Sequence, residues 1–133
     1  MSSSMTNFIA DEIIGAPFPP ILLASDNPRV AESLQKKLID EGFSVHLAPS
    51  YQALETLWQQ HRHGLVLLEV SNVHSVEAAV NAAMNIKRHD AGQFVGYLAD
   101  PILRTSGLAG DAIFPRTLHL IPQAIRRHFA QET

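Results

Sequence analysis

The stretch that decides the fold is GLVLLEV, residues 64–70. Its unbroken apolar run, 65–68, is typical of a strand that is covered on both faces, as in parallel α/β sheets. Burying a carboxylate is costly, so Glu69 should lie at the rim of the sheet, where such folds place their functional sites. Glu69 is therefore the first candidate site residue. The run alone fits equally well a glutamate that is simply the first solvated residue after the strand.

Composition indicates one globular domain. The chain has 133 residues, 46% of them apolar, and no cysteine, which excludes disulfides, thiolate chemistry and cysteine-based zinc sites. A net charge of −3 and a pI near 6.1 argue against a nucleic-acid-binding module. No apolar run approaches the ~20 residues that a membrane-spanning helix needs. Residues 1–14 contain no Lys or Arg and do not resemble a signal peptide, so a cytoplasmic protein is expected.

The chain divides into an N-terminal extension, 1–19, and a folded domain, 20–131. Phe8, Ile9 and Ile13 could share one side of a short helix, and the prolines of 16–20 separate this patch from the domain. Two interpretations stay open for the extension: a flexible tail, or an arm that binds a partner.

Strands and helices alternate from Ile21 onward. Strands are predicted over 21–24, 43–47, 65–70, 93–98 and 112–114. Helices are predicted from Pro28 to a stop at 41–42, after Ser50 with Leu54, Leu57 and Trp58 inward, and over 76–89, 101–106 and about 117–129. The predicted N-caps are Asn27, Ser50 and Ser75. Apolar stripes should face the core from the third helix (Val76, Ala79, Val80, Ala83, Met84) and from the last (Leu118, Ile121, Ile125, Phe129). Pro122 should kink or delay the first turn of the last helix.

This pattern predicts an α/β fold: a doubly wound, five-stranded parallel sheet of flavodoxin-like (βα)5 type with strand order 2-1-3-4-5. In that order the first and third strands are neighbours. Asp26 and Glu69 should therefore meet at one rim.

Over roughly Pro20 to Phe129 the sequence resembles the response-regulator receiver (CheY-like) domain family of two-component, phosphorelay-type signalling. The likeness lies in layout and hydrophobic pattern more than in signature residues. The segments that carry it are ILLASDN (21–27), EGFSVHLAPS (41–50), GLVLLEV (64–70), FVGYLAD (94–100) and AIFPRTL (112–118).

The resemblance implies a site of five groups: two acids that hold magnesium, a phosphoacceptor Asp, a Ser or Thr, and a Lys before a Pro. By position the acid pair falls on Ser25 and Asp26, the acceptor on Glu69, the hydroxyl on Leu98 and the lysine on Phe114, while the aromatic switch residue falls on Asp111.

Each departure weakens the implied chemistry. Losing one acid weakens magnesium binding, Phe114 supplies no countercharge, and Leu98 offers no hydrogen bond. Glu69 carries its carboxylate one methylene further out than Asp would. The expected protein is a pseudo-receiver, a degenerate member of the family, with no catalytic residue, no cofactor and no metal beyond a weak residual role for Asp26. Glu69 either imitates a phosphorylated state or is an inert relic, and the missing hydroxyl and lysine favour the relic.

Other motifs in the sequence give weaker evidence of a functional site. The seven histidines, His61 and His63 among them, lack metal-ligand spacing and are expected at the surface. The basic cluster 126–128 suits a helix end, and 107–110 is not a P-loop.

The predicted function is a non-enzymatic domain that acts through protein–protein interaction or dimerisation. The partner would be an output domain, a kinase, a regulator or a second copy. Only 15 residues separate Leu98 from Phe114, so the fourth helix is short and the family's usual partner face is remodelled. Alanines on the third helix would allow close approach of another helix (Ala78, Ala79, Ala82, Ala83). The alternative is a small-ligand sensor for a nucleotide or metabolite on the same fold. The sequence leaves open whether the chain stands alone or is the N-terminal module of a larger protein.

Overall fold

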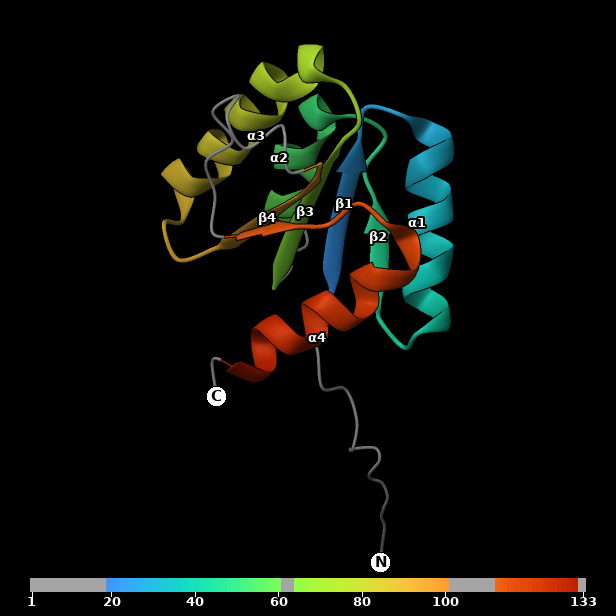
Figure 1. Ribbon diagram of the computed structural model, residues 1–133. Coiled ribbons are helices and arrows are strands. Elements are labelled where there is room, and N and C mark those ends of the chain that lie inside the picture. Colours follow the sequence, from blue (N-terminus) through green and yellow to red (C-terminus); the bar gives the residue numbers. More distant parts are fainter. Residues whose placement is uncertain (1–18, 61–63, 101–111, 132–133) are drawn as a thin grey trace, which may run out of the picture.

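The computed structural model (Figure 1) describes residues 19–60, 64–100 and 112–131. Its centre is a five-stranded parallel sheet in the order β2-β1-β3-β4-β5, which confirms the predicted fold and strand order. The strands are β1 (Ile21–Ser25), β2 (Val45–Leu47), β3 (Leu65–Val70), β4 (Phe94–Ala99) and β5 (Ala112–Phe114). In the register Glu69 lies opposite both Ser25 and Leu98, and Leu98 lies opposite Phe114.

Helices cover both faces of the sheet. Those in the described parts of the chain are α1 (Pro28–Asp40), α2 (Tyr51–Gln60), α3 (Val76–His89) and α4 (Ile121–Gln131), with short 3-10 turns at Val73–Ser75 and Leu118–Leu120. Figure 1 shows α2 and α3 on one side of the sheet, and α1 and α4 on the other. None of the helices in these segments is long and apolar enough to cross a membrane.

Two apolar cores result, because alternate residues of a strand point to opposite faces. Leu22, Val66 and Tyr97 belong to the core under α2 and α3, together with the fully buried Trp58. Ile21, Leu23 and Leu67 belong to the core under α1 and α4. Burial on both faces explains why β3 reads as an unbroken apolar run.

Helix caps fit the sequence in two of three places. Asn27 accepts hydrogen bonds from the backbone N–H of Arg29 and Val30, and Ser50 accepts one from Ala53. Ser75 stands at the N-cap position of α3, as predicted, but its side chain does not cap the helix. It makes no capping hydrogen bond, because the 3-10 turn before α3 already places it in a helical conformation.

Glycines permit two tight features. Gly42 follows α1 with a φ of +98°, a conformation that other residues rarely adopt. Gly64 lies against Pro19, so that a Cβ at Gly64 would fall only 2.1 Å from a side-chain atom of the proline. This contact holds the start of the domain against the start of β3.

Some helix faces differ from the prediction. Met84 and Leu118 are exposed rather than turned to the core, whereas Ile121 and Ile125 are buried. The 3-10 turn at Leu118–Leu120 precedes α4 and rotates Leu118 outward, and Pro122 then stands in the first turn of the helix, where its missing N–H costs nothing. Several predictions concern residues or side chains outside the described ones: the N-terminal extension, His61, His63, the helix at 101–106, the 107–110 loop, Asp111 and Phe129.

The alanines of α3 do not form the expected contact surface. Ala79, Ala82 and Ala83 are buried in the core beneath the helix, and only Ala78 is partly exposed. Small residues serve here to bring α3 close to its own sheet and to α2. Three of the four alanines are therefore not available to a helix from another protein.

Candidate functional site

The candidate site is built around Glu69, whose side chain is 1% exposed at the carboxyl end of β3. Its Oε1 accepts hydrogen bonds from the hydroxyls of Ser25, at 2.5 Å, and Ser71, at 3.1 Å. Its Oε2 lies 2.9 Å from the Ser71 hydroxyl and accepts a hydrogen bond from Nε of Arg116 at 2.7 Å. A carboxylate pays its desolvation cost only when such partners surround it. Glu69 is a buried, neutralised group rather than a solvated one.

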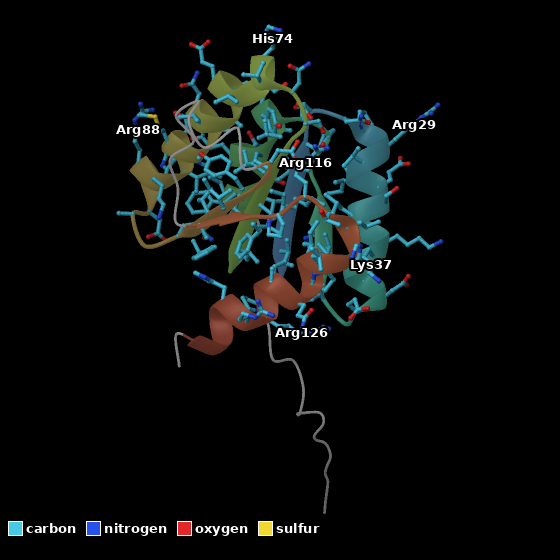
Figure 2. All side chains as sticks on the ribbon, viewed as in Figure 1. Arg29, Lys37, His74, Arg88, Arg116 and Arg126 are labelled. Atoms are coloured by element: carbon cyan, nitrogen blue, oxygen red, sulfur yellow. The ribbon has the colours of Figure 1, made fainter. Side chains whose placement is uncertain are left out.

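Arg116 comes from the loop between β5 and α4, two residues after Phe114. Its Nη1 donates to Asp100 and its Nη2 to the hydroxyl of Ser71, both at 3.2 Å. The guanidinium thus joins the ends of β3 and β4 to the loop that leads into α4. Figure 2 shows Arg116 lying across the carboxyl end of the sheet.

The electrostatics follow from this position. Partial burial lowers the pKa of Arg116, but its hydrogen bond to Glu69 and the charges of Glu69 and Asp100 outweigh burial, and the net pKa is raised. Phe114 does occupy the lysine position, yet the charge arrives from Arg116 instead.

Ser71 links the two acids that the sequence analysis brought to one rim. Its backbone N–H donates to both carboxylate oxygens of Asp26 at 3.2 Å, and the N–H of Asn72 adds another hydrogen bond to Asp26. Its hydroxyl donates a hydrogen bond to Glu69 and accepts one from Arg116. Asp26 and Glu69 therefore meet at the rim through Ser71, each with its own donors.

Ser25 stands where the resembling family carries an acid. Its hydroxyl donates to Glu69 and accepts a hydrogen bond from the N–H of Asn27 at 2.9 Å. A second carboxylate here would face Glu69 at repulsive distance. The neutral serine is what lets the glutamate fold inward at this point.

Tyr51, on the first turn of α2, adds a buried donor. Its hydroxyl donates to the backbone carbonyl of Glu69 at 2.6 Å. Burial, followed by the nearby charges of Asp26 and Glu69, raises the pKa of the phenol far above its ordinary value. Tyr51 therefore stays neutral and holds the end of β3 in place.

Leu98 and Phe114 lie in the core beneath this rim. Leu98 is fully buried and Phe114 is 5% exposed. Phe114 packs against Gly96, where an added Cβ would lie 3.0 Å from its ring. The two positions that would carry a hydroxyl and an ammonium in the family carry packing residues here.

A hollow of about 300 Å³ opens beside the site. Its walls come from the loop after β1 and from the first turns of α2 and α3, with Asp26, Ser50 and His74 among the lining residues. No group of three or more His, Cys, Asp or Glu side chains within residues 19–60, 64–100 and 112–131 is arranged to hold a metal ion.

Comparison with known proteins gives the fold. No family model matches the sequence, and no curated relative matches it. Solved structures do match. The chemotaxis protein CheY4 of Vibrio cholerae superposes with a TM-score of 0.68 at 13% identity, covering 83% of this chain and 98% of that one. The chain has the receiver-domain fold.

Two further receiver structures extend the comparison. The non-phosphorylated HemR receiver domain of Leptospira biflexa has a TM-score of 0.59 at 23% identity, covering 83% of this chain and 91% of that one. An atypical orphan response regulator, described as having a phosphorylation-independent regulatory mechanism, has a TM-score of 0.60 at 18% identity, with 81% and 90% covered.

Sequence reasoning found the acids and missed the cation. It placed Ser25, Asp26, Glu69, Leu98 and Phe114 at one level of the sheet, and the register aligns all of them except Asp26. It missed Arg116, Ser71 and Tyr51. A search for any cation within two residues of the lysine position would have found Arg116, because a long side chain compensates for a displaced backbone.

Proposed function

We propose that this domain is a receiver-fold signalling module that works by protein–protein interaction without aspartyl phosphorylation. The observation that carries the proposal is the occupied carboxylate of Glu69. Ser25, Ser71 and Arg116 fill the space around both oxygens, which leaves no open approach for an in-line phosphoryl donor.

The second support is the metal side of the site. Phosphoryl transfer needs a divalent cation to neutralise developing charge, and magnesium is held by carboxylates with near-ideal octahedral geometry. Ser25 replaces one acid of the family's pair. The carboxylate oxygens of Asp26 already accept hydrogen bonds from the backbone N–H groups of Ser71 and Asn72. The domain is therefore proposed to be no enzyme and to have no resident metal.

Glu69 takes a structural role in this proposal. Its negative charge holds Arg116, and Arg116 holds Asp100 and the loop before α4. The permanent contact between the Glu69 carboxylate and the Arg116 guanidinium thus fixes the loops in one arrangement. In a switchable receiver domain, transient phosphorylation would select such an arrangement. The domain has one fixed signalling state, and partners recognise that state.

The neighbours agree with this direction. One solved structure of the same fold is described as phosphorylation-independent, and another, from H. pylori, as an orphan response regulator. A partner protein or a second copy fits such a module better than a nucleotide, since the charged groups at the rim already satisfy one another. The hollow beside Asp26 is the place where a small ligand would bind under the alternative function.

The test exposes the protein to acetyl phosphate or beryllofluoride with magnesium. We expect no mass increase in intact mass spectra and no chemical-shift change at Ser71 or Arg116. A receiver domain with the complete acid pair, Asp, Thr and Lys, treated in parallel, controls for active reagent. A stable adduct, or magnesium-dependent shifts centred on Glu69, would overturn the proposal.

The interaction mode has its own test. Sedimentation velocity over a wide concentration range separates self-association from monomeric behaviour. Concentration-dependent dimers would support a second copy as the partner, with an interface of roughly 1,200–2,000 Å² in total. A strict monomer would remove the homodimer and leave a different protein as partner.

A further inference from the structure

One surface next to the Glu69 site combines an apolar hollow with an arginine, Arg29, that has no ion-pair partner among the described residues. It lies between the N-terminal half of α1 and the turn before α4, has a volume of about 340 Å³, and is called here the α1 groove. Its lining residues are Arg29, Val30, Ser33, Leu34, Arg116 and Leu118.

Its apolar part is open to solvent. Leu118 is 39% exposed although sequence periodicity places it in the core, and Leu120 beside it is also exposed. An exposed apolar patch rimmed by polar residues is typical of a surface that something covers.

The two arginines of the groove differ in whether they have an ion-pair partner. Arg116 is already paired with Glu69 and Asp100. Arg29 forms no side-chain hydrogen bond or ion pair with any residue in the described part of the chain, and Figure 2 shows it extending outward from the start of α1. The groove therefore offers one free positive charge beside aliphatic side chains. It suits an acidic, amphipathic segment.

The chain itself contains such a segment. Residues 8–14, FIADEII, place Asp11 and Glu12 among four large apolar side chains, and residues 1–18 include no Lys or Arg. We propose that residues 8–14 dock intramolecularly in the α1 groove, with their apolar side chains against Val30 and Leu118 and their acids toward Arg29.

The length of the chain allows this. Pro19 lies at the amino end of the sheet, against Gly64, and the groove lies at the carboxyl end. The five residues of β1 cover about 17 Å between the two ends. The ten residues that separate Phe18 from Phe8 span up to about 33 Å when extended. Arg116 belongs to both the groove and the Glu69 site, but the inference rests on Arg29, Val30 and Leu118 and does not depend on the proposed function.

Spin labelling tests the docking in the full chain. Because the protein has no cysteine, Thr6→Cys gives a single attachment site for a nitroxide. We expect the label to broaden the amide signals of Val30, Ser33 and Leu118 and to leave Asn81, on the α3 side of the sheet, unaffected. Broadening elsewhere, or nowhere in the domain, would overturn the proposal.

Two controls sharpen the result. Mixing labelled, isotope-free protein with unlabelled, 15N-enriched protein reveals contacts between copies, and broadening in that mixture alone would assign the groove to a second copy and overturn intramolecular docking.

Arg29→Glu should lower the ratio of docked to undocked protein by about two- to fivefold, as expected for one exposed ion pair. Adding Asp11→Lys and Glu12→Lys to Arg29→Glu should restore the broadening.

Leu118→Asp tests the apolar contact. The residue is exposed, so the domain should keep its fold, and an unchanged spectrum for Asn81 and Trp58 checks this. We expect the broadening of Val30 and Ser33 to disappear. Broadening that survives in this variant would show that the segment does not use the groove.

Discussion

Among the described residues, two glutamate–arginine pairs tie the C-terminal part of the chain to the rest, and they differ in geometry and in exposure to solvent. In the first, Nε of Arg116 lies 2.7 Å from Glu69, and the side chains are 26% and 1% exposed. In the second, Nη1 of Arg126 lies 3.2 Å from Glu41, and the side chains are 41% and 36% exposed. Burial decides what each pair does. The outer pair adds a little stability, whereas the inner pair makes a carboxylate tolerable inside the protein.

The largest expected effect separates these pairs directly. Arg116→Ala leaves Glu69 buried without a countercharge, and should lower the free energy of unfolding by about 3–5 kcal/mol. Arg126→Ala, the matched control, should lower it by about 1 kcal/mol or less. Denaturant unfolding followed by Trp58 fluorescence measures both. Equal losses in the two variants would mean that water reaches Glu69 and solvates it.

The hydroxyl of Ser71 supports the inner pair and gives a smaller effect. Ser71→Ala removes a donor to Glu69 and an acceptor for Arg116, while the backbone contact to Asp26 remains. A loss of about 1–3 kcal/mol is expected, because charged partners are left short of a hydrogen bond. Ser33→Ala on the exposed face of α1 is the control and should change stability little. A Ser71→Ala variant as stable as wild type would show that Arg116 alone neutralises the glutamate.

The sequence could predict the sheet that carries both ion pairs, because the periodicity of apolar residues reports directly which positions are buried. β3 and the order of the sheet followed from 65–68 and from the alternation of elements. The positions of the charged ends of long side chains were harder to predict from the sequence. Arg116 is two positions from where a lysine was sought, and only the geometry of the loop after Pro115 brings its guanidinium back to Glu69. Leu118 was misplaced because a 3-10 turn interrupts the helical period just before α4.

Tyr51 supplies a pH-dependent test of the buried side. Its raised pKa means that the folded state favours the neutral phenol, so its contribution to stability is complete below the ordinary pKa of 10.0 and falls as the pH rises above it. Tyr51→Phe should cost about 0.5–1.5 kcal/mol at neutral pH through the lost bond to the Glu69 carbonyl. It should also flatten the fall in stability above pH 10. Tyrosinate absorbance gives the readout, and Tyr97→Phe is the control for the other tyrosine. An unchanged alkaline slope would assign that slope to another group.

Salt gives the smallest effect and the most selective one. At 1 M salt the Debye length is about 3 Å, so charges in contact with solvent are screened while buried charges are affected much less. The difference in stability between wild type and Arg126→Ala should therefore shrink toward the part that comes from packing over Phe43 and from the bond to the Glu41 carbonyl. The difference between wild type and Arg116→Ala should persist, because no counterion reaches a carboxylate that is 1% exposed. Repeating both unfolding curves in potassium chloride from 0.05 to about 1 M measures the contrast. If the Arg116 difference falls with salt as steeply as the Arg126 difference, the inner pair is solvated, and burial does not distinguish the two pairs.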